Sequence, residues 1–164
     1  MIRVDHAGEY GAVRIYEGQL AVLGRSKSEA ADAIRHMAKQ EEAHLKAFDA
    51  LVNERRVRPT ALAPVWRLAG FALGAATALM GEKAAMACTE AVEDVIDRHY
   101  ADQVERLGEH DPELKEKIEA FRAEEIAHRD TATAHGAAEA PAYPLLSGAI
   151  KAGCKVAIAL STRI

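Results

Sequence analysis

The chain has 164 residues, of which 49% are hydrophobic and only 5% aromatic, and its formal net charge is −4 at pH 7. This length suits one domain with a sizeable core, and we expect a single domain over residues 1–164. Because the charge is mild and no basic patch is interleaved with aromatic residues, the composition argues against nucleic-acid binding. Long Ala-, Leu- and Glu-rich segments, without the alternation typical of strands, predict an all-α helical bundle.

Two helices are predicted in the first third of the chain, over residues 5–23 and 27–53, because apolar residues recur there at spacings of three and four. Gly24 ends the first helix, and Ser26 or Ser28 is the expected N-cap of the second. Side chains able to bind a metal interrupt the apolar stripes at Glu9, Glu41 and His44.

An apolar crossover segment is predicted over residues 61–81, after a proline-containing connector. Its uncharged run, residues 68–81, is 14 residues long, which is shorter than the roughly 20 residues that a helix needs to span a bilayer. Two interpretations are open for this segment. It is either a helix that lies on a membrane surface without crossing it or an ordinary crossover helix that covers the core.

The second half of the chain repeats the helical pattern. One helix is predicted over residues 82–107, and the next begins at Asp111, a capping acid followed by Pro112 at the first helical position. Their apolar stripes are interrupted at Glu93, Glu125 and His128. A last, amphipathic helix is expected over residues 143–161, and the basic residues placed opposite its apolar side are Lys151, Lys155 and Arg163.

Six polar side chains therefore occupy positions where apolar residues are expected, and they are candidates for metal ligands. They are Glu9, Glu41, His44, Glu93, Glu125 and His128. Two of the acids begin Glu-x-x-His pairs, whose spacing of three places both side chains on one helix face. In each half, the remaining glutamate precedes the Glu-x-x-His pair by 32 residues, which indicates two related helical hairpins. Uncompensated charges in a bundle core are costly, so cations between these groups explain their convergence best.

The donor types indicate which metal would bind. Four glutamates with two neutral histidines balance the charge of two divalent cations, so the filled site is neutral in its reduced state. Hard carboxylate oxygens with one imidazole for each ion suit iron or manganese, and the missing thiolate argues against structural zinc. Six ligands for two ions leave positions open for dioxygen, and this ligand set is that of ferritin-like di-iron bundles.

Four further residues have less specific signals. His99 and Tyr100 follow Glu93 by one to two helical turns, and the spacing leaves open whether they support the site or belong to the core. Cys88 and Cys154 form no CxxC pair, so we expect small buried hydrophobic residues in a reducing compartment.

Eight segments resemble the demethoxyubiquinone hydroxylase (Coq7) family of ubiquinone biosynthesis, and the resemblance extends in order over essentially all 164 residues. They are VDHAGEYGAVRIYEGQLAVLGR, QEEAHLKAF, RVRPT, GFALGAATALMG, AMACTEAVEDVIDRHY, FRAEEIAHRD, APAY and AGCKVAIALS. In this resemblance the family's iron ligands fall on the six candidates, and its His-Tyr pair near the quinone pocket falls on His99 and Tyr100. The implied fold is a ferritin-like four-helix bundle with an additional crossover helix and a C-terminal helix.

The resemblance also implies an activity, the hydroxylation of the ring of a demethoxyubiquinone or demethoxyubiquinol. Two iron ions would be the cofactor and dioxygen the co-substrate, while the electron donor stays open between NADH and a reductase. The family implies attachment to the inner membrane, on the bacterial cytoplasmic face or the mitochondrial matrix face. In eukaryotes it implies a partnership with the lipid-binding Coq9 protein, and the sequence is also compatible with a homo-oligomer.

Two other functions are open from the sequence. A ferroxidase or peroxide-scavenging protein like ferritin or rubrerythrin would use the same ligand set, although the apolar crossover and the missing rubredoxin-like cysteine pairs argue against it. A lipid carrier or scaffold would keep the helices without turnover, and a metal analysis without iron or manganese would favour it.

Overall fold

The computed structural model describes all 164 residues, and they form helices without any strand, which confirms the predicted all-α class. In chain order the elements are α1 (Ile2–Leu23), α2 (Glu29–Glu54), α3 (Ala63–Leu79), α4 (Glu82–Leu107), α5 (Pro112–Ala134), the short 3₁₀ helix η1 (Ala137–Glu139) and α6 (Tyr143–Ser161). The bounds of α4 and α6 are those expected from the sequence.

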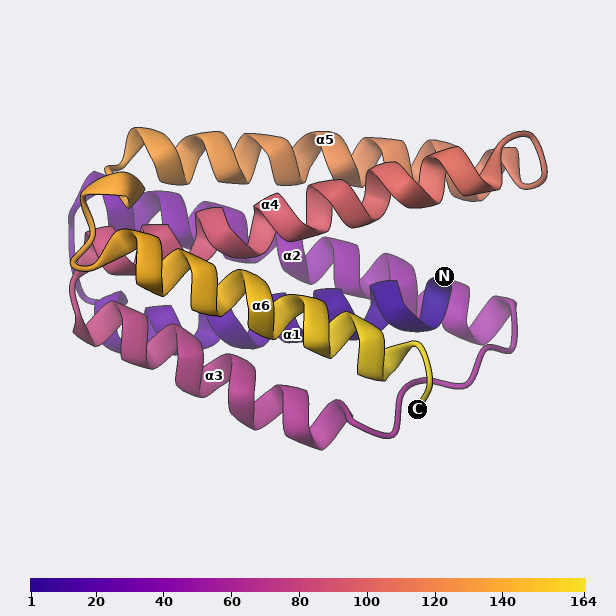
Figure 1. Cartoon of the computed structure of the whole chain (residues 1–164), viewed down its shortest axis with the longest axis horizontal. Coiled ribbons are helices and arrows are strands. Elements are labelled where there is room, and N and C mark those ends of the chain that lie inside the picture. The colour runs from indigo at the N-terminus through magenta and orange to yellow at the C-terminus, as the bar shows by residue number, and fades with distance from the viewer.

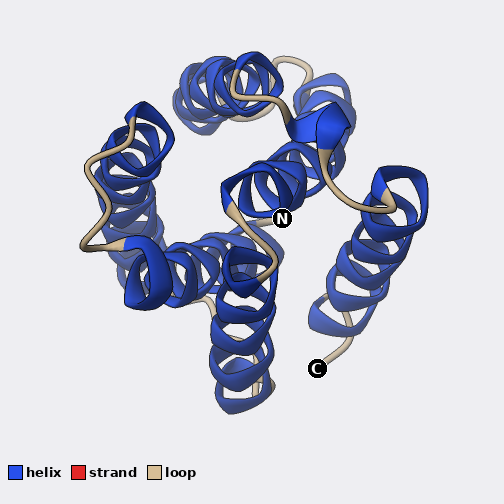
Figure 2. Cartoon of the chain, turned by 90° about the vertical axis from the view of Figure 1, so that its left-hand side faces the viewer, coloured by secondary structure: helices blue, strands red, loops and turns tan.

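Two helical hairpins, α1–α2 and α4–α5, form the four-helix bundle (Figure 1). Each hairpin is followed by one more apolar helix that packs on the first helix of that hairpin, α3 on α1 and α6 on α4. Figure 2 shows α6, the helix that ends at the C-terminus, at the edge of the molecule. The chain is thus built as two similar three-helix halves that face each other.

Local chemistry explains where two of the bundle helices begin. The Ser28 hydroxyl accepts a hydrogen bond from the Ala31 backbone N–H at 3.1 Å at the start of α2. The Asp111 carboxylate accepts one from the Leu114 N–H at 3.2 Å at the start of α5. Both residues are N-caps of the kind predicted from the sequence, and each satisfies a backbone donor that the helix leaves unpaired.

The start of α1 differs from the prediction, because the helix begins at Ile2 rather than at Asp5. Val4 is buried, so the first turn is fixed by packing rather than by a polar cap. Asp5 is also buried, and its carboxylate accepts a hydrogen bond from the Gln103 amide at 2.5 Å and lies 3.1 Å from Nε2 of His99. This acid therefore joins α1 to α4 instead of starting a helix.

Glycines allow α1 and α3 to approach so closely that their backbones touch. A methyl group added at Gly74 would lie 1.9 Å from the carbonyl oxygen of Ile15, and one added at Gly18 would lie 2.2 Å from that of Phe71. No side chain fits at either position. The crossover helix consequently turns small residues toward the bundle and its large apolar residues outward.

The orientation of α6 corrects one expectation from the sequence. Lys151 points to the bundle, where its ammonium group lies 3.4 Å from Glu90 and 3.0 Å from Asp94. Tyr143 and Ser147, at successive turns before it, also donate hydrogen bonds to Glu90. Polar contacts therefore hold α6 on α4, although by length and composition this 19-residue helix is apolar enough to cross a membrane.

Candidate metal centre

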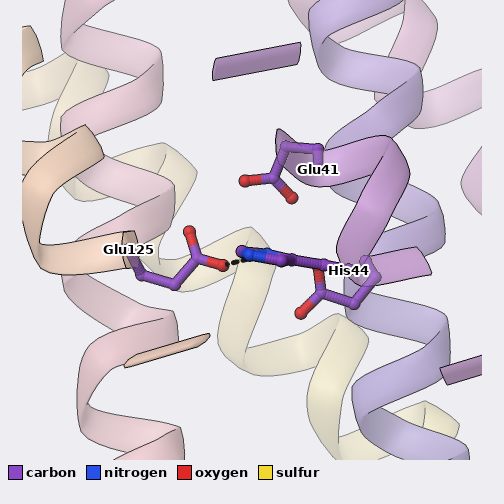
Figure 3. Close-up of side chains that lie close together, drawn as sticks. Glu41, His44 and Glu125 are labelled. Atoms are coloured by element: carbon purple, nitrogen blue, oxygen red, sulfur yellow. Dashed lines mark ion pairs between the residues drawn. The ribbon is translucent and has the colours of Figure 1, made fainter. Parts of the chain in front are cut away.

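The six candidate ligands meet inside the bundle and form what we call the central cluster. They come from four helices, namely Glu9 of α1, Glu41 and His44 of α2, Glu93 of α4, and Glu125 and His128 of α5. Each is no more than 3% exposed. Figure 3 shows Glu41 and His44 extending from α2 toward Glu125. Apolar residues close the bundle on both sides, around Met37 and Met86 at one end and Phe48 and Ile118 at the other.

The central cluster consists of two overlapping groups whose ligand atoms lie within 4.8 Å of one another. The first group is Glu9, Glu41, His44 and Glu125, and the second is Glu41, Glu93, Glu125 and His128. Each group has one imidazole and one glutamate of its own. Glu41 and Glu125 belong to both, as expected of carboxylates able to bridge two cations.

An internal two-fold relation organises these residues. Every member of the central cluster has a counterpart 84 residues away, as Glu9 has Glu93 and His44 has His128. The relation extends to the tyrosines Tyr16 and Tyr100, each of which lies seven residues after the lone glutamate of its half. The two groups are therefore built alike, one from each half of the chain.

The two tyrosines bind across the bundle rather than within their own halves. Tyr100 of α4 donates a hydrogen bond to Glu9 of α1, and Tyr16 of α1 donates one to Glu93 of α4 at 3.2 Å. Both hydroxyl groups are buried. Burial and neighbouring carboxylates raise the pKa of each tyrosine well above its usual range, so both remain donors.

When only protons neutralise its carboxylates, the charge of the central cluster depends on burial and on the contacts among its members. Burial, followed by repulsion from Glu125, raises the pKa of Glu41 and of Glu93 well above the usual range. Burial also raises the pKa of Glu9. For Glu125, burial acts in the same direction, but the contacts with His128 and His44 outweigh it and hold its pKa at about 2.

The histidine beside these carboxylates is affected in turn. Burial acts to lower the pKa of His44, but contacts with Glu125 and Glu9 outweigh it and raise this pKa to about 10. The central cluster thus retains protons at neutral pH that entering cations would displace.

The atoms of the central cluster fit metal ions better than they fit one another. Three buried polar atoms of the central cluster have no hydrogen-bond partner, and they are Oε2 of Glu9, Oε1 of Glu41 and Nδ1 of His44. Each is a metal-donor atom, and Nδ1 of His44 lies only 3.0 Å from Glu125 and 3.5 Å from Glu9 without hydrogen-bond geometry at Nδ1. Metal-donor atoms that face one another without hydrogen bonds can all bind cations that lie between them.

Of the two further residues singled out in the sequence, only Tyr100 touches the central cluster, through Glu9. His99 instead faces Asp5 and Gln103 at the edge of the bundle. Both cysteines are free, as expected, with Cys88 buried and Cys154 partly exposed.

A large apolar cavity of about 530 Å³ lies between α1, α3, α4 and α6. Leu73, Leu146 and Ile158 line it, whereas neither His99 nor Tyr100 does. Its wall also includes Gly8, Ala12, Val92 and Ile96, each of which lies within one helical turn of Glu9 or Glu93 in the sequence. The cavity therefore reaches the helix segments that carry the central cluster.

Sequence reasoning missed three residues that touch the central cluster, namely Tyr16, Gln40 and Glu124. Gln40 and Glu124 immediately precede the two Glu-x-x-His pairs and contact the outer nitrogens of the histidines. All three obey the same 84-residue relation, since Tyr16 matches Tyr100 and Gln40 matches Glu124. Extending the repeat beyond the acidic residues would have identified them.

Comparisons with known proteins agree over the whole chain. The family model described as "Ubiquinone biosynthesis protein COQ7" matches residues 1–161. A 3-demethoxyubiquinol 3-hydroxylase of Rhodospirillum rubrum is 62% identical over 163 residues, which cover 99% of this chain and 76% of that protein. The NADPH-dependent 3-demethoxyubiquinone 3-hydroxylase of Mus musculus, named as mitochondrial, is 55% identical over 99% of this chain and 76% of its own. The mitochondrial 5-demethoxyubiquinone hydroxylase of Saccharomyces cerevisiae is 41% identical over 100% and 77%. The chain belongs to the COQ7 family of ubiquinone biosynthesis proteins.

Proposed function

We propose that this chain hydroxylates the ring of a demethoxyubiquinone or demethoxyubiquinol in ubiquinone biosynthesis, with dioxygen, at two iron ions held by the central cluster. The observation that carries the proposal is the convergence of six buried metal donors in two overlapping groups. The names of the relatives supply the reaction, because the one from Rhodospirillum rubrum is a 3-demethoxyubiquinol 3-hydroxylase.

The chain contributes the geometry of the two metal positions. Glu9 and His44 would hold one ion, Glu93 and His128 the other, and the carboxylates shared by both groups would bridge them. When bound, the two irons supply the activation of dioxygen. Tyr16 and Tyr100 each fix one carboxylate oxygen of Glu93 and Glu9, the glutamates that belong to only one group. The apolar residues at both ends of the bundle keep bulk water from the reacting atoms.

The substrate of this reaction has a six-membered quinone ring and an isoprenoid tail, and the apolar cavity suits both. We propose that the tail lies along α3 and α6 while the ring approaches the wall formed by Gly8 and Ile96. No charged side chain lines the cavity, and the Ser161 hydroxyl in its wall already accepts a hydrogen bond from Trp66, so water gains little by staying in the cavity.

The outer face of the cavity supports attachment to a membrane surface. Large apolar residues on and beside α3 and α6 point into solvent, with Leu68 73% exposed, Leu79 75% and Leu145 76%. Large apolar side chains that are exposed in this way often mark a surface that binds a membrane or another protein. Of the two interpretations of the crossover segment, this exposure favours an interfacial helix over one that only covers the core.

Location, electrons and partners follow from the same proposal. The chain would lie peripherally on an inner membrane, on the cytoplasmic face in bacteria or the matrix face in mitochondria. One oxygen atom enters the ring and the other leaves as water, which requires two electrons from a donor such as a reduced nicotinamide nucleotide. A Coq9-like lipid-binding partner, in a eukaryotic setting, and a homo-oligomer complete the proposal.

Product analysis tests the activity directly. The metal-free protein is loaded with two equivalents of Fe²⁺ under anaerobic conditions, mixed with a short-tailed demethoxyquinol, and exposed to ¹⁸O₂. We expect a ring-hydroxylated product that contains one ¹⁸O atom. Formation of mineralised iron without this product would refute the proposal and support a ferroxidase.

Glu93→Ala removes a ligand that only one group uses, so it should bind less iron and form no product. Glu105→Ala, an exposed glutamate on the same helix, is the matched control. Full iron content and full activity in Glu93→Ala would overturn the assignment of this ligand.

A further inference from the structure

The two histidines of the central cluster are connected on their outer side by a chain of three hydrogen bonds. Nε2 of His44 lies 3.2 Å from Oε2 of Glu124, and Nε2 of His128 lies 3.1 Å from Oε1 of Gln40. The Gln40 amide group donates to the same Glu124 oxygen at 2.9 Å. Gln40 and Glu124 therefore contact each other, and each of them contacts one imidazole.

This chain of contacts has one consistent assignment of protons. An imidazole that binds a cation through Nδ1 carries its hydrogen on Nε2 and must donate it. The carboxylate of Glu124 and the amide oxygen of Gln40 both accept, while the amide N–H of Gln40 donates to Glu124. Both rings are thus held with Nδ1 facing the centre, and Phe121 packs on the ring of His44 at 4.2 Å.

The bracing is symmetric in position but not in charge. Gln40 and Glu124 are counterparts separated by 84 residues, like the histidines that they contact. His44 is backed by a carboxylate, and His128 by a neutral amide. A hydrogen bond to an ionised acceptor is roughly twice as strong as a neutral one, and it makes the imidazole a better metal donor. The Glu124 side chain is 42% exposed, which weakens this difference without removing it.

We propose that Gln40 and Glu124 are positioning residues that make the two metal positions unequal, so that the position of His44 binds a divalent cation more tightly and fills first. The inference rests on the proposed dinuclear centre and adds an order of filling to it. The ligands of the two groups are the same in type and number, so the difference lies in the residues that contact the two histidines from outside.

The test is a titration of metal-free protein with Zn²⁺, observed through the Nδ1 resonances of ¹⁵N-labelled histidine. In the wild type the first equivalent should shift His44 and the second His128. Outer contacts of metal-bound histidines change affinity by about tenfold or more. Glu124→Gln should therefore weaken the first binding step by about tenfold, so that both positions fill together.

The exchanged variant Gln40→Glu with Glu124→Gln keeps composition, charge and hydrogen-bond count, and it should reverse the order so that His128 shifts first. Glu119→Gln, an exposed acid on α5, controls for the loss of one charge and should leave the order unchanged. Simultaneous filling in the wild type, or an unchanged order in the exchanged variant, would overturn the inference while leaving the dinuclear centre in place. Binding of fewer than two ions by the wild type would refute the centre itself, and the inference with it.

Discussion

Tyr100 of α4 and Glu9 of α1 are hydrogen-bonded across the bundle, and the same contact is returned by the counterparts of these residues in the other half. Each half thereby fixes the glutamate of the opposite half that belongs to only one group, Glu9 or Glu93. These buried bonds join α1 and α4 at the depth of the central cluster, and the contacts of Asp5 with Gln103 and His99 join the same two helices one turn earlier on α1.

Replacing Tyr100 by Phe should impair metal binding and turnover together. The substitution leaves Glu9 without its donor, and a hydrogen bond to a charged group contributes about 1.5–3 kcal/mol, equivalent to roughly tenfold or more in affinity. We expect a loss of that size in Fe²⁺ affinity, measured by anaerobic titration. Tyr10→Phe is the control, because Tyr10 lies one residue from Glu9 and stacks on Arg14 instead. Equal affinity in wild type and Tyr100→Phe would contradict this role.

The metal-free protein should lose stability as the pH rises from about 5 to 9. The folded-state pKa of Glu41 and Glu93 is raised by burial, so the folded protein holds more protons than the unfolded chain above their usual pKa of 4.5. Stability then falls with pH, by up to about 1.4 kcal/mol for each such proton and pH unit. The raised pKa of His44, about 10, has the same sign, since its contribution is complete below 6.5 and is lost as the pH passes 10.

Urea unfolding at pH 5.5, 7 and 8.5 measures this slope. The stabilisation from Glu125, with its pKa of about 2, is already complete in this range and does not oppose the trend. The double variant Glu41→Gln with Glu93→Gln should flatten the slope, and two equivalents of Zn²⁺ should remove it in the wild type. A stability that rises with pH in the metal-free wild type would disprove this account.

The sequence predicted what depends on local signals. The starts of α2 and α5 were predictable because Ser28 and Asp111 are caps that act within one turn. The central cluster was predictable because an acid on an apolar stripe has to be buried. The prediction for Lys151, on the side of α6 away from the bundle, was wrong. The acids that attract it lie on α4, and the sequence of α6 alone does not indicate them.

The glycines of the first helix indicated that a neighbour packs closely there, but the sequence could not identify that neighbour as α3. Gly74→Ala should lower the free energy of unfolding by about 1–3 kcal/mol, because its methyl group would overlap the Ile15 carbonyl oxygen and force α3 away from α1. Gly148→Ala is the control on α6, where an added methyl group meets nothing within 4 Å. It should be neutral or stabilise by up to about 1 kcal/mol. Equal urea unfolding midpoints for the wild type and Gly74→Ala would show that α3 is not tightly packed on α1.

Filling the apolar cavity should raise KM without changing iron content. Gly153 lines the cavity on α6, so the indole ring of Gly153→Trp would occupy the space proposed for the substrate. With a short-tailed quinol we expect KM to rise at least about tenfold, because the affinity of an apolar ligand scales with the apolar surface it buries. Gly148→Trp adds the same ring to the same helix outside the cavity and should keep the wild-type KM. An unchanged KM in Gly153→Trp would place the substrate elsewhere.

Membrane attachment should depend on the apolar residues exposed outside the cavity. Leu68→Glu with Leu145→Glu puts two charges on α3 and α6 at side chains that are more than 70% exposed, so the fold should tolerate them. Flotation with phosphatidylcholine–phosphatidylglycerol vesicles should then recover little of the variant, because each buried leucine contributes about 1.5–3 kcal/mol to binding and each charge opposes it. Ala50→Glu with Ala120→Glu adds the same charge on α2 and α5 and should float like the wild type. Turnover of a short-tailed quinol should be normal in both variants, since the soluble substrate needs no bilayer. Undiminished flotation of the leucine variant would show that α3 and α6 only cover the core.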